Sequence, residues 1–364
     1  MTVGIALVGC GTISHEYLRN LTTFPDVRVV ACTDLDTERA KAVAAEYHVP
    51  EAGEPELALR HPDVELVVNL TIPAAHIDVS TAAVLAGKHV YTEKPLAMDA
   101  DGGAGLLAAA AKTGVRVGSA PDTFLGAGLQ SAYRLIARGD IGTPQSALTL
   151  MQSPGPESWH HSPEFLFQPG AGPLFDIGPY YLTALAAAFG GVTRVAATAR
   201  KAFAERVIGS GPRAGTRFRV EVPTNVSGLL EFSAGQAATT IFSFDSPLSR
   251  QGFVEITGTD ATLSVPDPNR FDGPLRLRRA REEDWTPVET VGAHVGRGMG
   301  VLDLARAIRT GAPHRADAAG ALHIVEVMEA LTASAETGQF VAVNSDFPTP
   351  SPLPEDWDPY QRTL

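Results

Sequence analysis

Apolar runs and helical patterns alternate along the first 120 residues of the chain. The runs at 4–9, 27–33, 65–70, 89–94 and 115–120 are short and mostly apolar. The segments at 12–23, 37–47, 74–85 and 99–114 carry helical patterns. Apolar strands that alternate with helices are typical of a parallel sheet covered on both faces. We therefore expect an α/β domain with a doubly wound Rossmann sheet over residues 1–120.

The pattern changes after residue 120. A helical segment at 123–139 is followed by extended runs with turn residues between them, at 145–152, 192–200, 225–234, 236–244, 252–258, 261–265 and 275–280. Runs without intervening helices predict a large, mostly antiparallel open sheet. Helices are expected near 176–189, 298–310 and 317–337. We expect an α+β domain over residues 121–346 and a Pro-rich surface tail over 347–364.

The first strand ends in the sequence GCGTIS at 9–14, which then leads into a helix. This is the dinucleotide-binding pattern G-x-G-x-x-G with Ser14 at the third glycine position. Gly9 permits the tight turn, and Gly11 lets the backbone approach a pyrophosphate at the helix N-terminus. The pattern predicts cofactor contacts from Gly9, Gly11, Thr12 and Ile13.

An acidic residue ends the second strand. Asp34 lies where the ribose-binding acid of this motif belongs, and its carboxylate would accept from ribose hydroxyls and repel a 2′-phosphate. No arginine follows directly, and Asp36 adds negative charge. We expect NAD as the cofactor, with NADP as the second possibility; helix capping is the alternative role for Asp34.

Composition narrows the function classes. The chain has 364 residues, 44% of them hydrophobic, and a net charge of −12. This charge argues against a nucleic-acid-binding face and against binding to an anionic membrane surface. Cys10 and Cys32 are expected to be buried free thiols, although a disulfide stays open. The sequence has no Cys or His residues at metal-ligand spacing, so we expect no metal. It has no apolar stretch of 18 residues and no room for a leader before Val3, so we expect a cytoplasmic protein.

Two further segments follow strands of the predicted sheet, at the edge where ligands bind in open α/β folds. In TIPAAH (71–76), Thr71 and Pro73 are candidates to line the cofactor, and His76 is either a ligand or a helix residue.

In the second of these segments, EKP (93–95), Glu93 and Lys94 are cofactor candidates. The proline biases Lys94 toward an extended backbone, and its ammonium group can polarise a carbonyl or lower the pKa of a hydroxyl. An exposed turn lysine is the alternative.

The segment GAGPLFDIGPYYLTAL (170–185) places Asp176 and Tyr180 four residues apart, on one side of a helix. Since proline is tolerated in a first helical turn and poorly later, Pro179 predicts a helix that starts near Asp176.

Together these motifs resemble the Gfo/Idh/MocA oxidoreductases, the family of glucose–fructose oxidoreductase and inositol dehydrogenase. The resemblance runs from Val3 to about Phe340. It implies a Rossmann domain and a second domain whose open sheet mediates assembly into a homodimer or homotetramer. It also implies NAD(P)-dependent oxidation or reduction of sugars, cyclitols or their derivatives.

The resemblance assigns roles to individual residues. It makes Lys94 the catalytic lysine and Asp176 the acid of the family motif D-x-G-x-H, and Tyr180 stands at the histidine position. The proton carrier stays open between Tyr180 and a histidine of the loop ESWHHSPEF, His160 or its neighbour His161. The substrate-binding candidates are Asp122 in APDTFLGAG, Trp159, His160, Asp176 and Tyr180.

We therefore predict an NAD-dependent dehydrogenase that oxidises a secondary hydroxyl of a small-molecule sugar, glycoside or cyclitol. The alternatives are an NADPH-dependent reductase of a keto-sugar, a cofactor-sensing regulatory protein without turnover, and a redox cycle with tightly bound cofactor.

Overall fold

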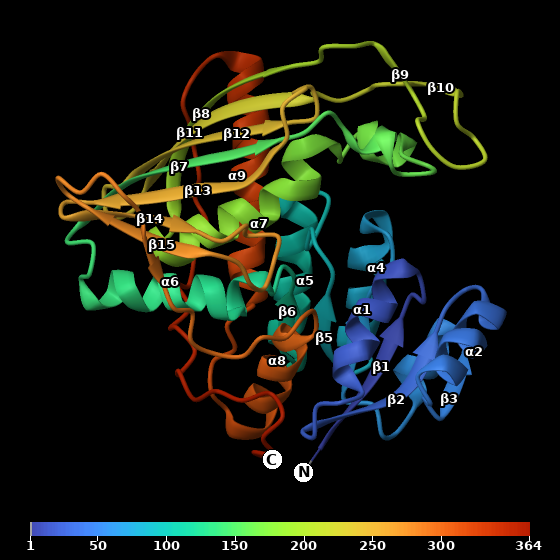
Figure 1. Cartoon of the computed structure of the whole chain (residues 1–364). Helices are drawn as coiled ribbons and strands as arrows, with labels where there is room; N and C mark the ends of the chain where they lie inside the picture. The colour runs from blue at the N-terminus through green and yellow to red at the C-terminus, as the bar shows by residue number, and fades with distance from the viewer. Residues whose placement is uncertain (1) are drawn as a thin grey trace. The chain divides into compact units, whose positions relative to one another are not determined.

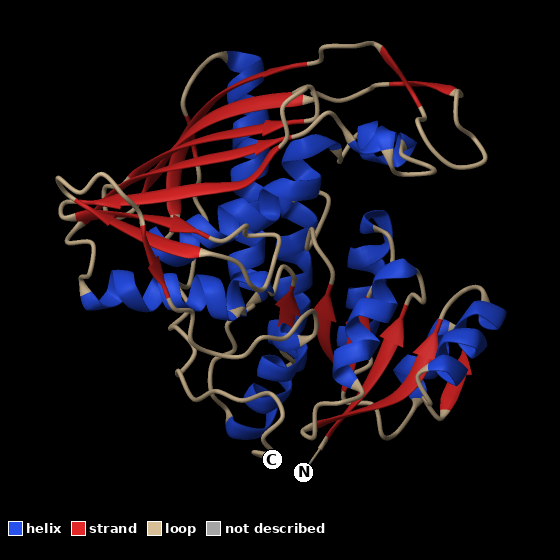
Figure 2. Cartoon of the chain, in the orientation of Figure 1, coloured by secondary structure: helices blue, strands red, loops and turns tan. Residues whose placement is uncertain are grey.

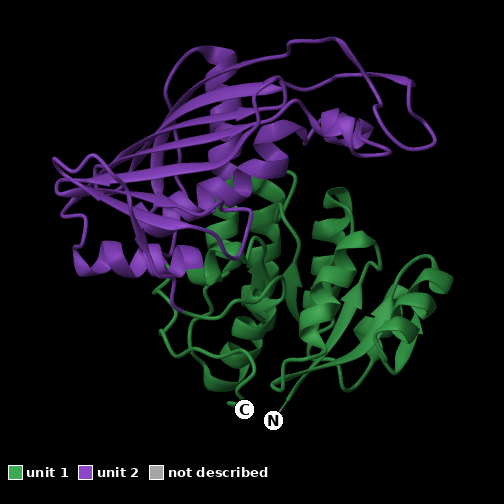
Figure 3. Cartoon of the chain, in the orientation of Figure 1, with its two compact units in different colours: residues 1–127, 292–325, 350–364 green, residues 128–291, 326–349 purple. Residues whose placement is uncertain are grey.

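The computed structural model describes residues 2–364 and divides the chain into two compact units (Figure 3). The first unit comprises residues 1–127, 292–325 and 350–364, and the second comprises residues 128–291 and 326–349. The expected boundary at residue 120 lies close to the end of the first segment. Residues 292–325 and 350–364, which the sequence analysis placed in the second domain and the tail, pack in the first unit.

The first unit is built on a six-stranded sheet in the order β3-β2-β1-β4-β5-β6 (Figure 1). Every neighbouring pair in it is parallel. All six residues of β1 are buried, as expected for a central strand covered on both faces. The strands are β1 Val3–Val8, β2 Val27–Thr33, β3 Glu51–Gly53, β4 Leu66–Asn69, β5 His89–Thr92 and β6 Val117–Ser119.

Local capping sets the ends of several helices in this unit. Asp36 accepts from the Arg39 amide at the start of α2, and Asp99 accepts from the Gly102 amide at the start of α5. Gly114 ends α5 in the left-handed region, with φ of 72°. The helices are α1 Thr12–Leu21, α2 Thr37–Glu46, α3 Pro55–Arg60, α4 His76–Leu85, α5 Ala100–Thr113 and α8 Met299–Thr310; α9, Ala318–Thr337, begins in this unit.

Residues from the end of the sequence close one side of this unit. Asp26 is fully buried before β2, and its carboxylate accepts from Arg306 Nε at 2.9 Å and from the amides of Thr363 and Leu364 at 3.0 and 3.1 Å. The segment 350–364 is therefore fixed to the Rossmann sheet by a buried charge.

The second unit contains a nine-stranded sheet in the order β16-β15-β14-β13-β7-β12-β11-β8-β17. Its pairs are antiparallel except β12 with β7, which makes the sheet mixed and confirms the predicted mostly antiparallel class. The strands are β7 Pro144–Gln152, β8 Val192–Arg200, β11 Asn225–Phe232, β12 Ala237–Ser243, β13 Arg250–Gly258, β14 Ala261–Val265, β15 Leu275–Arg279, β16 Thr286–Val288 and β17 Val341–Ala342.

One face of this sheet is covered by helix α7, Gly172–Phe189 (Figures 1 and 2). Alternate residues of each strand point to this face; in β11 they are Val226, Gly228, Leu230 and Phe232. The Phe232 ring contacts Phe189 of α7, and Tyr181 of α7 contacts Phe242 of β12. The apolar core of the unit lies between this helix and the sheet. Helix α6, Ala127–Arg138, precedes β7.

The structure differs from the expectation in several elements, among them the strands β16 and β17, which were not predicted. Helix α7 begins at Gly172, one turn before the predicted start, so Pro179 lies inside the helix and leaves the Phe175 carbonyl without its usual amide partner. The short elements β3 and α3 were not predicted, nor was the separate two-stranded sheet of β9 (Glu205–Val207) and β10 (Arg217–Arg219).

Among residues 2–364, none of the helices is long and apolar enough to cross a membrane.

Candidate functional site

The turn between β1 and α1 has a backbone that requires glycine. Gly9 has φ of +99°, and a Cβ there would lie 2.7 Å from the Leu70 carbonyl oxygen, so no larger residue fits. Gly11 caps the start of α1, and a Cβ there would meet no described atom within 4 Å. The first turn of the helix carries no acidic residue. Its amides and partial positive charge suit a pyrophosphate.

Ser14 stands at the third glycine position of the motif, and its hydroxyl group has a hydrogen-bond partner. Its side chain is fully buried, and its hydroxyl donates to the Gly11 carbonyl at 2.7 Å. The serine thus fits close helix–strand packing and also closes the first turn of α1.

The carboxylate of Asp34 is held at the end of β2 by two backbone amides. Oδ2 accepts from Cys10 N at 2.7 Å, and Oδ1 accepts from Asp36 N at 2.9 Å. Arg39 Nη1 lies 3.7 Å from Oδ2, so an arginine five residues along the chain is a neighbour of this carboxylate although none follows it directly. The turn, the helix end and this carboxylate fit the pyrophosphate and ribose of an adenine dinucleotide.

The segment after β4 is organised by Asn69, which is buried and accepts from both the amide and the hydroxyl of Thr71. Pro73 is exposed at the start of a short 3₁₀ turn. His76 is fully buried, and its Nδ1 and Nε2 lie 2.7 Å from the Pro95 carbonyl and 3.1 Å from the Thr71 carbonyl. Of the two roles left open for His76, the helix residue fits these contacts, because the ring lies against two backbone carbonyls.

The backbone around Lys94 is held by side chains of the first unit. The Lys94 amide donates to Glu93 Oε2 at 2.9 Å, and Glu93 Oε1 accepts from the Tyr17 hydroxyl at 2.9 Å. Glu93 is 7% exposed, so its carboxylate is directed into the protein rather than toward a cofactor. The Lys94 side chain is half-buried at the carboxyl end of β5.

Asp122 has a different role from the predicted one. It is fully buried, and Oδ2 accepts from the amides of Gly298 and Gly300 at 2.9 and 3.1 Å, at the start of α8. Burial raises its pKa, while Arg297 and the two amides oppose the rise. Asp122 therefore fixes α8 to the Rossmann sheet, which corrects its assignment as a substrate ligand.

Asp176 and Tyr180 lie one turn apart on α7, as expected from their spacing. Asp176 is half-buried, and Tyr180 is 4% exposed. The next tyrosine, Tyr181, belongs to the core: it accepts from the Gly252 amide at 2.7 Å.

The loop after β7 presents aromatic side chains to solvent. Trp159 is 66% exposed and Phe165 is 52% exposed, and both rings contact the His160 ring edge-on at 5.5 and 5.4 Å. His160 Nδ1 accepts from the Ser162 amide at 3.0 Å, which fixes the imidazole orientation.

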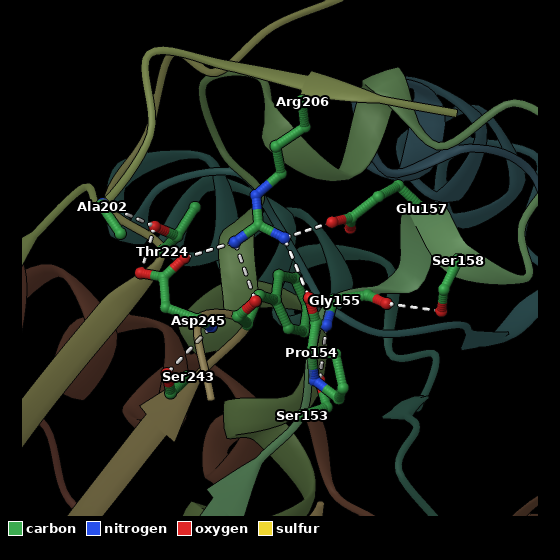
Figure 4. A network of polar contacts seen from close by, with 11 residues as sticks. Ser153, Pro154, Gly155, Glu157, Ser158, Ala202, Arg206, Thr224, Ser243 and Asp245 are labelled. Carbon is green, nitrogen blue, oxygen red and sulfur yellow. Dashed lines mark hydrogen bonds and ion pairs between the residues drawn. The ribbon is translucent and has the colours of Figure 1, made fainter. Parts of the chain in front are cut away.

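A buried arginine anchors this loop. Arg206 of β9 lies between the carboxylates of Glu157 and Asp245, and it also donates to the carbonyls of Pro154 and Phe244 (Figure 4). Asp245 accepts in addition from the Thr224 hydroxyl at 2.6 Å. Sequence reasoning missed this network because Arg206 is 49 residues from Glu157 and 39 from Asp245.

In the part of the chain that the structure describes, no three His, Cys, Asp or Glu side chains gather in a way that would hold a metal ion. A parallel sheet with the order 3-2-1-4-5-6, a glycine turn at a helix N-terminus and an acid at the end of the second strand define a dinucleotide-binding protein.

Comparison with known proteins identifies the family. Residues 3–120 match the oxidoreductase family with an NAD-binding Rossmann fold, and residues 129–264 match the GFO/IDH/MocA C-terminal domain. The chain belongs to the GFO/IDH/MocA oxidoreductases.

Individual relatives agree with this assignment. An inositol 2-dehydrogenase of Ralstonia nicotianae is 35% identical over 153 residues, which is 40% of this chain and 44% of the relative. The match thus spans less than half of that enzyme. An NAD-binding oxidoreductase from Klebsiella pneumoniae has 25% identity and a TM-score of 0.81, with 95% of this chain and 100% of that chain covered. A levoglucosan dehydrogenase in complex with NADH and L-sorbose has a TM-score of 0.83 at 20% identity, over 94% and 99% of the chains, and shares the fold.

Proposed function

We propose that this protein is an NAD-dependent dehydrogenase that oxidises a secondary hydroxyl of a sugar, glycoside or cyclitol. The observation that carries the proposal is the Asp34 carboxylate, oriented by the Cys10 amide at the end of β2. A carboxylate in this place accepts hydrogen bonds from a ribose and disfavours a 2′-phosphate.

Lys94 is the residue to which we assign stabilisation of the reacting oxygen. When NAD is bound, its nicotinamide supplies the hydride acceptor. A hydroxyl that loses its proton develops negative charge on one oxygen, and a preorganised ammonium group stabilises that charge. The fixed backbone on both sides of Lys94 supports this role, because little of the lysine main chain has to be ordered during the reaction.

We assign orientation of the substrate to Asp176 and removal of the hydroxyl proton to Tyr180. Both side chains project from one side of α7, which is rigidly packed on the sheet of its unit. His160 is the competing base. Its Nδ1 accepts from the Ser162 amide, so the neutral ring carries its proton on Nε2, and Nδ1 would have to release this hydrogen bond to take the substrate proton. Trp159 offers an exposed aromatic face to the C–H face of a sugar ring.

The second candidate is an NADPH-dependent reductase of a keto-sugar. One observation favours it: Arg39 Nη1 lies 3.7 Å from Asp34 Oδ2 and could donate to a 2′-phosphate if the carboxylate turned away. A cofactor-sensing protein without turnover is the alternative from a different class.

Binding and turnover separate these candidates. We expect NADH to bind more tightly than NADPH by isothermal titration, and NAD⁺ to be reduced with at least one member of a panel that includes myo-inositol, levoglucosan, aldoses and methyl glycosides. Tighter binding of NADPH, with oxidation of NADPH by keto-sugars, would favour the reductase. Tight NADH binding without turnover of any panel member in either direction would favour the sensor.

We also propose that the chain forms a homo-oligomer through the outer face of the nine-stranded sheet. Leu148 of β7, Thr239 of β12 and Leu229 of β11 lie in register in one row across that face. The two leucines are 39% and 37% exposed. Light scattering should show a dimer or tetramer that Leu148→Glu with Leu229→Glu dissociates; a monomeric wild-type protein would contradict the proposal.

A further inference from the structure

Two buried side chains hold the main chain of the Lys94 loop, one on each side of the lysine. Glu93 accepts from the Lys94 amide at 2.9 Å, and His76 Nδ1 lies 2.7 Å from the carbonyl of Pro95. Glu93 itself is fixed to the sheet by its amide, which donates to the Asn69 carbonyl at 2.8 Å. The main chain that carries Lys94 is thus clamped before and after the side chain.

The first clamp extends to the cofactor-binding helix. Tyr17 is fully buried in α1, and its hydroxyl donates to the free oxygen of the Glu93 carboxylate at 2.9 Å. Burial and the Glu93 charge raise the pKa of Tyr17 well above its ordinary value, so the hydroxyl stays a donor throughout the working pH range. The helix that carries Gly11 at its N-terminus therefore also fixes the carboxylate that holds Lys94.

The second clamp ties the loop to the segment after β4. His76 begins α4, and its carbonyl accepts from the buried Asn69 amide group at 3.0 Å. Burial lowers the pKa of His76. A neutral ring carries one N–H, and the shorter of its two carbonyl contacts, 2.7 Å from Nδ1 to Pro95 against 3.1 Å from Nε2 to Thr71, places that proton on Nδ1. A purely apolar residue at position 76 would leave the Pro95 carbonyl without this donor.

We propose that Tyr17 and His76 are positioning residues for Lys94, Tyr17 acting through Glu93 and His76 acting through the Pro95 carbonyl. The inference rests on the proposed catalytic role of Lys94. Neither side chain is exposed, so neither reaches a substrate. They fix the main chain at Lys94, so the ammonium group can move only by rotation about its side-chain bonds. A catalytic group that is held in this way loses less freedom on reaching its reactive position, which raises kcat.

The first test uses Tyr17→Phe, which removes one oxygen and keeps the ring. We expect kcat to fall about ten- to hundredfold with the best polyol of the panel, the range for a misplaced catalytic group, while the Kd for NADH stays within about twofold. Tyr133→Phe is the matched control, because Tyr133 is also buried and its hydroxyl donates to a backbone carbonyl at 3.3 Å. Its kcat should stay within about twofold of wild type.

A double variant separates positioning from general packing. In the Lys94→Ala background, Tyr17→Phe should cause no further loss of kcat, because it acts only through the lysine. A further loss equal to that in the wild-type background would overturn the proposal. If Lys94→Ala itself leaves kcat unchanged, the proposed function of Lys94 fails; if Lys94→Ala is impaired and Tyr17→Phe is not, only the positioning role fails.

The second test needs no substrate. Hydrogen exchange followed by mass spectrometry in the protein without cofactor should show faster exchange of the Lys94 amide in Tyr17→Phe, by about tenfold, and no change in Tyr133→Phe. Unchanged exchange at Lys94 would overturn the first clamp.

For the second clamp, His76→Leu removes the donor to Pro95 and His76→Asn retains an N–H in a similar place. We expect His76→Asn to keep at least a third of wild-type kcat and His76→Leu to lose tenfold or more. If His76→Leu does not fold, the Asn variant alone is used, and an unchanged melting temperature shows that it is fully folded. A tenfold or larger loss of kcat in that folded variant would overturn the positioning role of His76.

Discussion

The backbone N–H of Cys10 donates to Oδ2 of Asp34 at 2.7 Å, so the phosphate turn and the β2 carboxylate form one hydrogen-bonded unit. A substitution of Asp34 therefore also removes a hydrogen bond from the phosphate turn. The other oxygen of Asp34 is held by the Asp36 amide, which leaves the carboxylate little freedom to rotate away from a ribose.

This arrangement predicts how cofactor preference can be changed. Asp34→Ser with Leu35→Arg removes the repelling charge and adds a cation at a side chain that is 90% exposed. Arg39, released from Asp34, adds a second cation. We expect a shift toward NADP of at least tenfold, about 1.4 kcal/mol, in the ratio of Kd values. Leu35→Arg alone, which keeps the carboxylate, should shift the ratio less; an equal shift would contradict the role of Asp34.

Lys94 should contribute to chemistry more than to cofactor binding. Lys94→Ala removes the cation that stabilises the reacting oxygen, so kcat should fall about 10²- to 10⁴-fold while the Kd for NADH stays within about twofold. Lys112→Ala, at an exposed position of α5, is the matched control and should keep wild-type kcat. A near-normal kcat for Lys94→Ala would remove this residue from the mechanism.

The proton carrier can be identified with two variants and a pH profile. If Tyr180 is the base, Tyr180→Phe should lose a hundredfold or more in kcat, whereas His160→Ala should mainly raise KM. Histidines ordinarily titrate near pH 6.5 and tyrosines near pH 10, so the acid limb of the kcat profile also distinguishes the two. A wild-type kcat for Tyr180→Phe, with a hundredfold loss for His160→Ala, would give the proton to the loop histidine.

The network around Arg206 should dominate the stability of the second unit. Arg206→Met leaves the largely buried carboxylates of Glu157 and Asp245, whose side chains are 14% and 9% exposed, without their cation, and we expect the free energy of unfolding to fall by about 3–5 kcal/mol. Arg213→Met is the control: Arg213 pairs with Glu164 but is half exposed, so its loss should cost no more than about 1 kcal/mol. Urea denaturation measures both. Equal effects for the two variants would show that the buried network adds no special stability.

His89 should make the first unit less stable in acid. Its Nδ1 accepts from the Arg116 amide at 2.8 Å, which requires that nitrogen to be unprotonated, and burial together with Arg116 lowers the pKa. The unfolded chain then binds more protons than the folded one between the folded pKa and about 6.5, so stability is lost as pH falls through this window. His89→Asn keeps an acceptor without titrating, so its stability should fall less between pH 7 and pH 5 in urea denaturation. An equal fall would exclude His89.

The contiguous βα units of the first domain could be predicted because their signals are local. Gly9, Gly11 and Asp34 lie within one βαβ segment, and the pattern of apolar strands predicts the sheet that places them together. Asp122 could not be assigned in this way. An acid after a strand of a parallel sheet resembles a ligand, and its actual partners, the amides of Gly298 and Gly300, are 176 and 178 residues away.

The second unit shows a different limit. The start of α7 was misplaced because Pro179 was read as the first-turn proline, whereas Pro173, six residues earlier, is the proline at the true start. The strands β9 and β10 are three residues long, too short for an alternating pattern. The Arg206 network joins segments that lie far apart in the sequence, around Glu157, Arg206 and Asp245, so no local pattern predicts it.

The buried carboxylates of Asp26 and Asp122 have a consequence for synthesis on the ribosome. Their partners are encoded far downstream: Arg306, Thr363 and Leu364 for one, and Gly298 and Gly300 for the other. Until those residues emerge, the Rossmann sheet would have to bury two uncompensated acids, which is costly. The first unit, whose synthesis begins first, is therefore completed last, after all of residues 128–291 have left the ribosome.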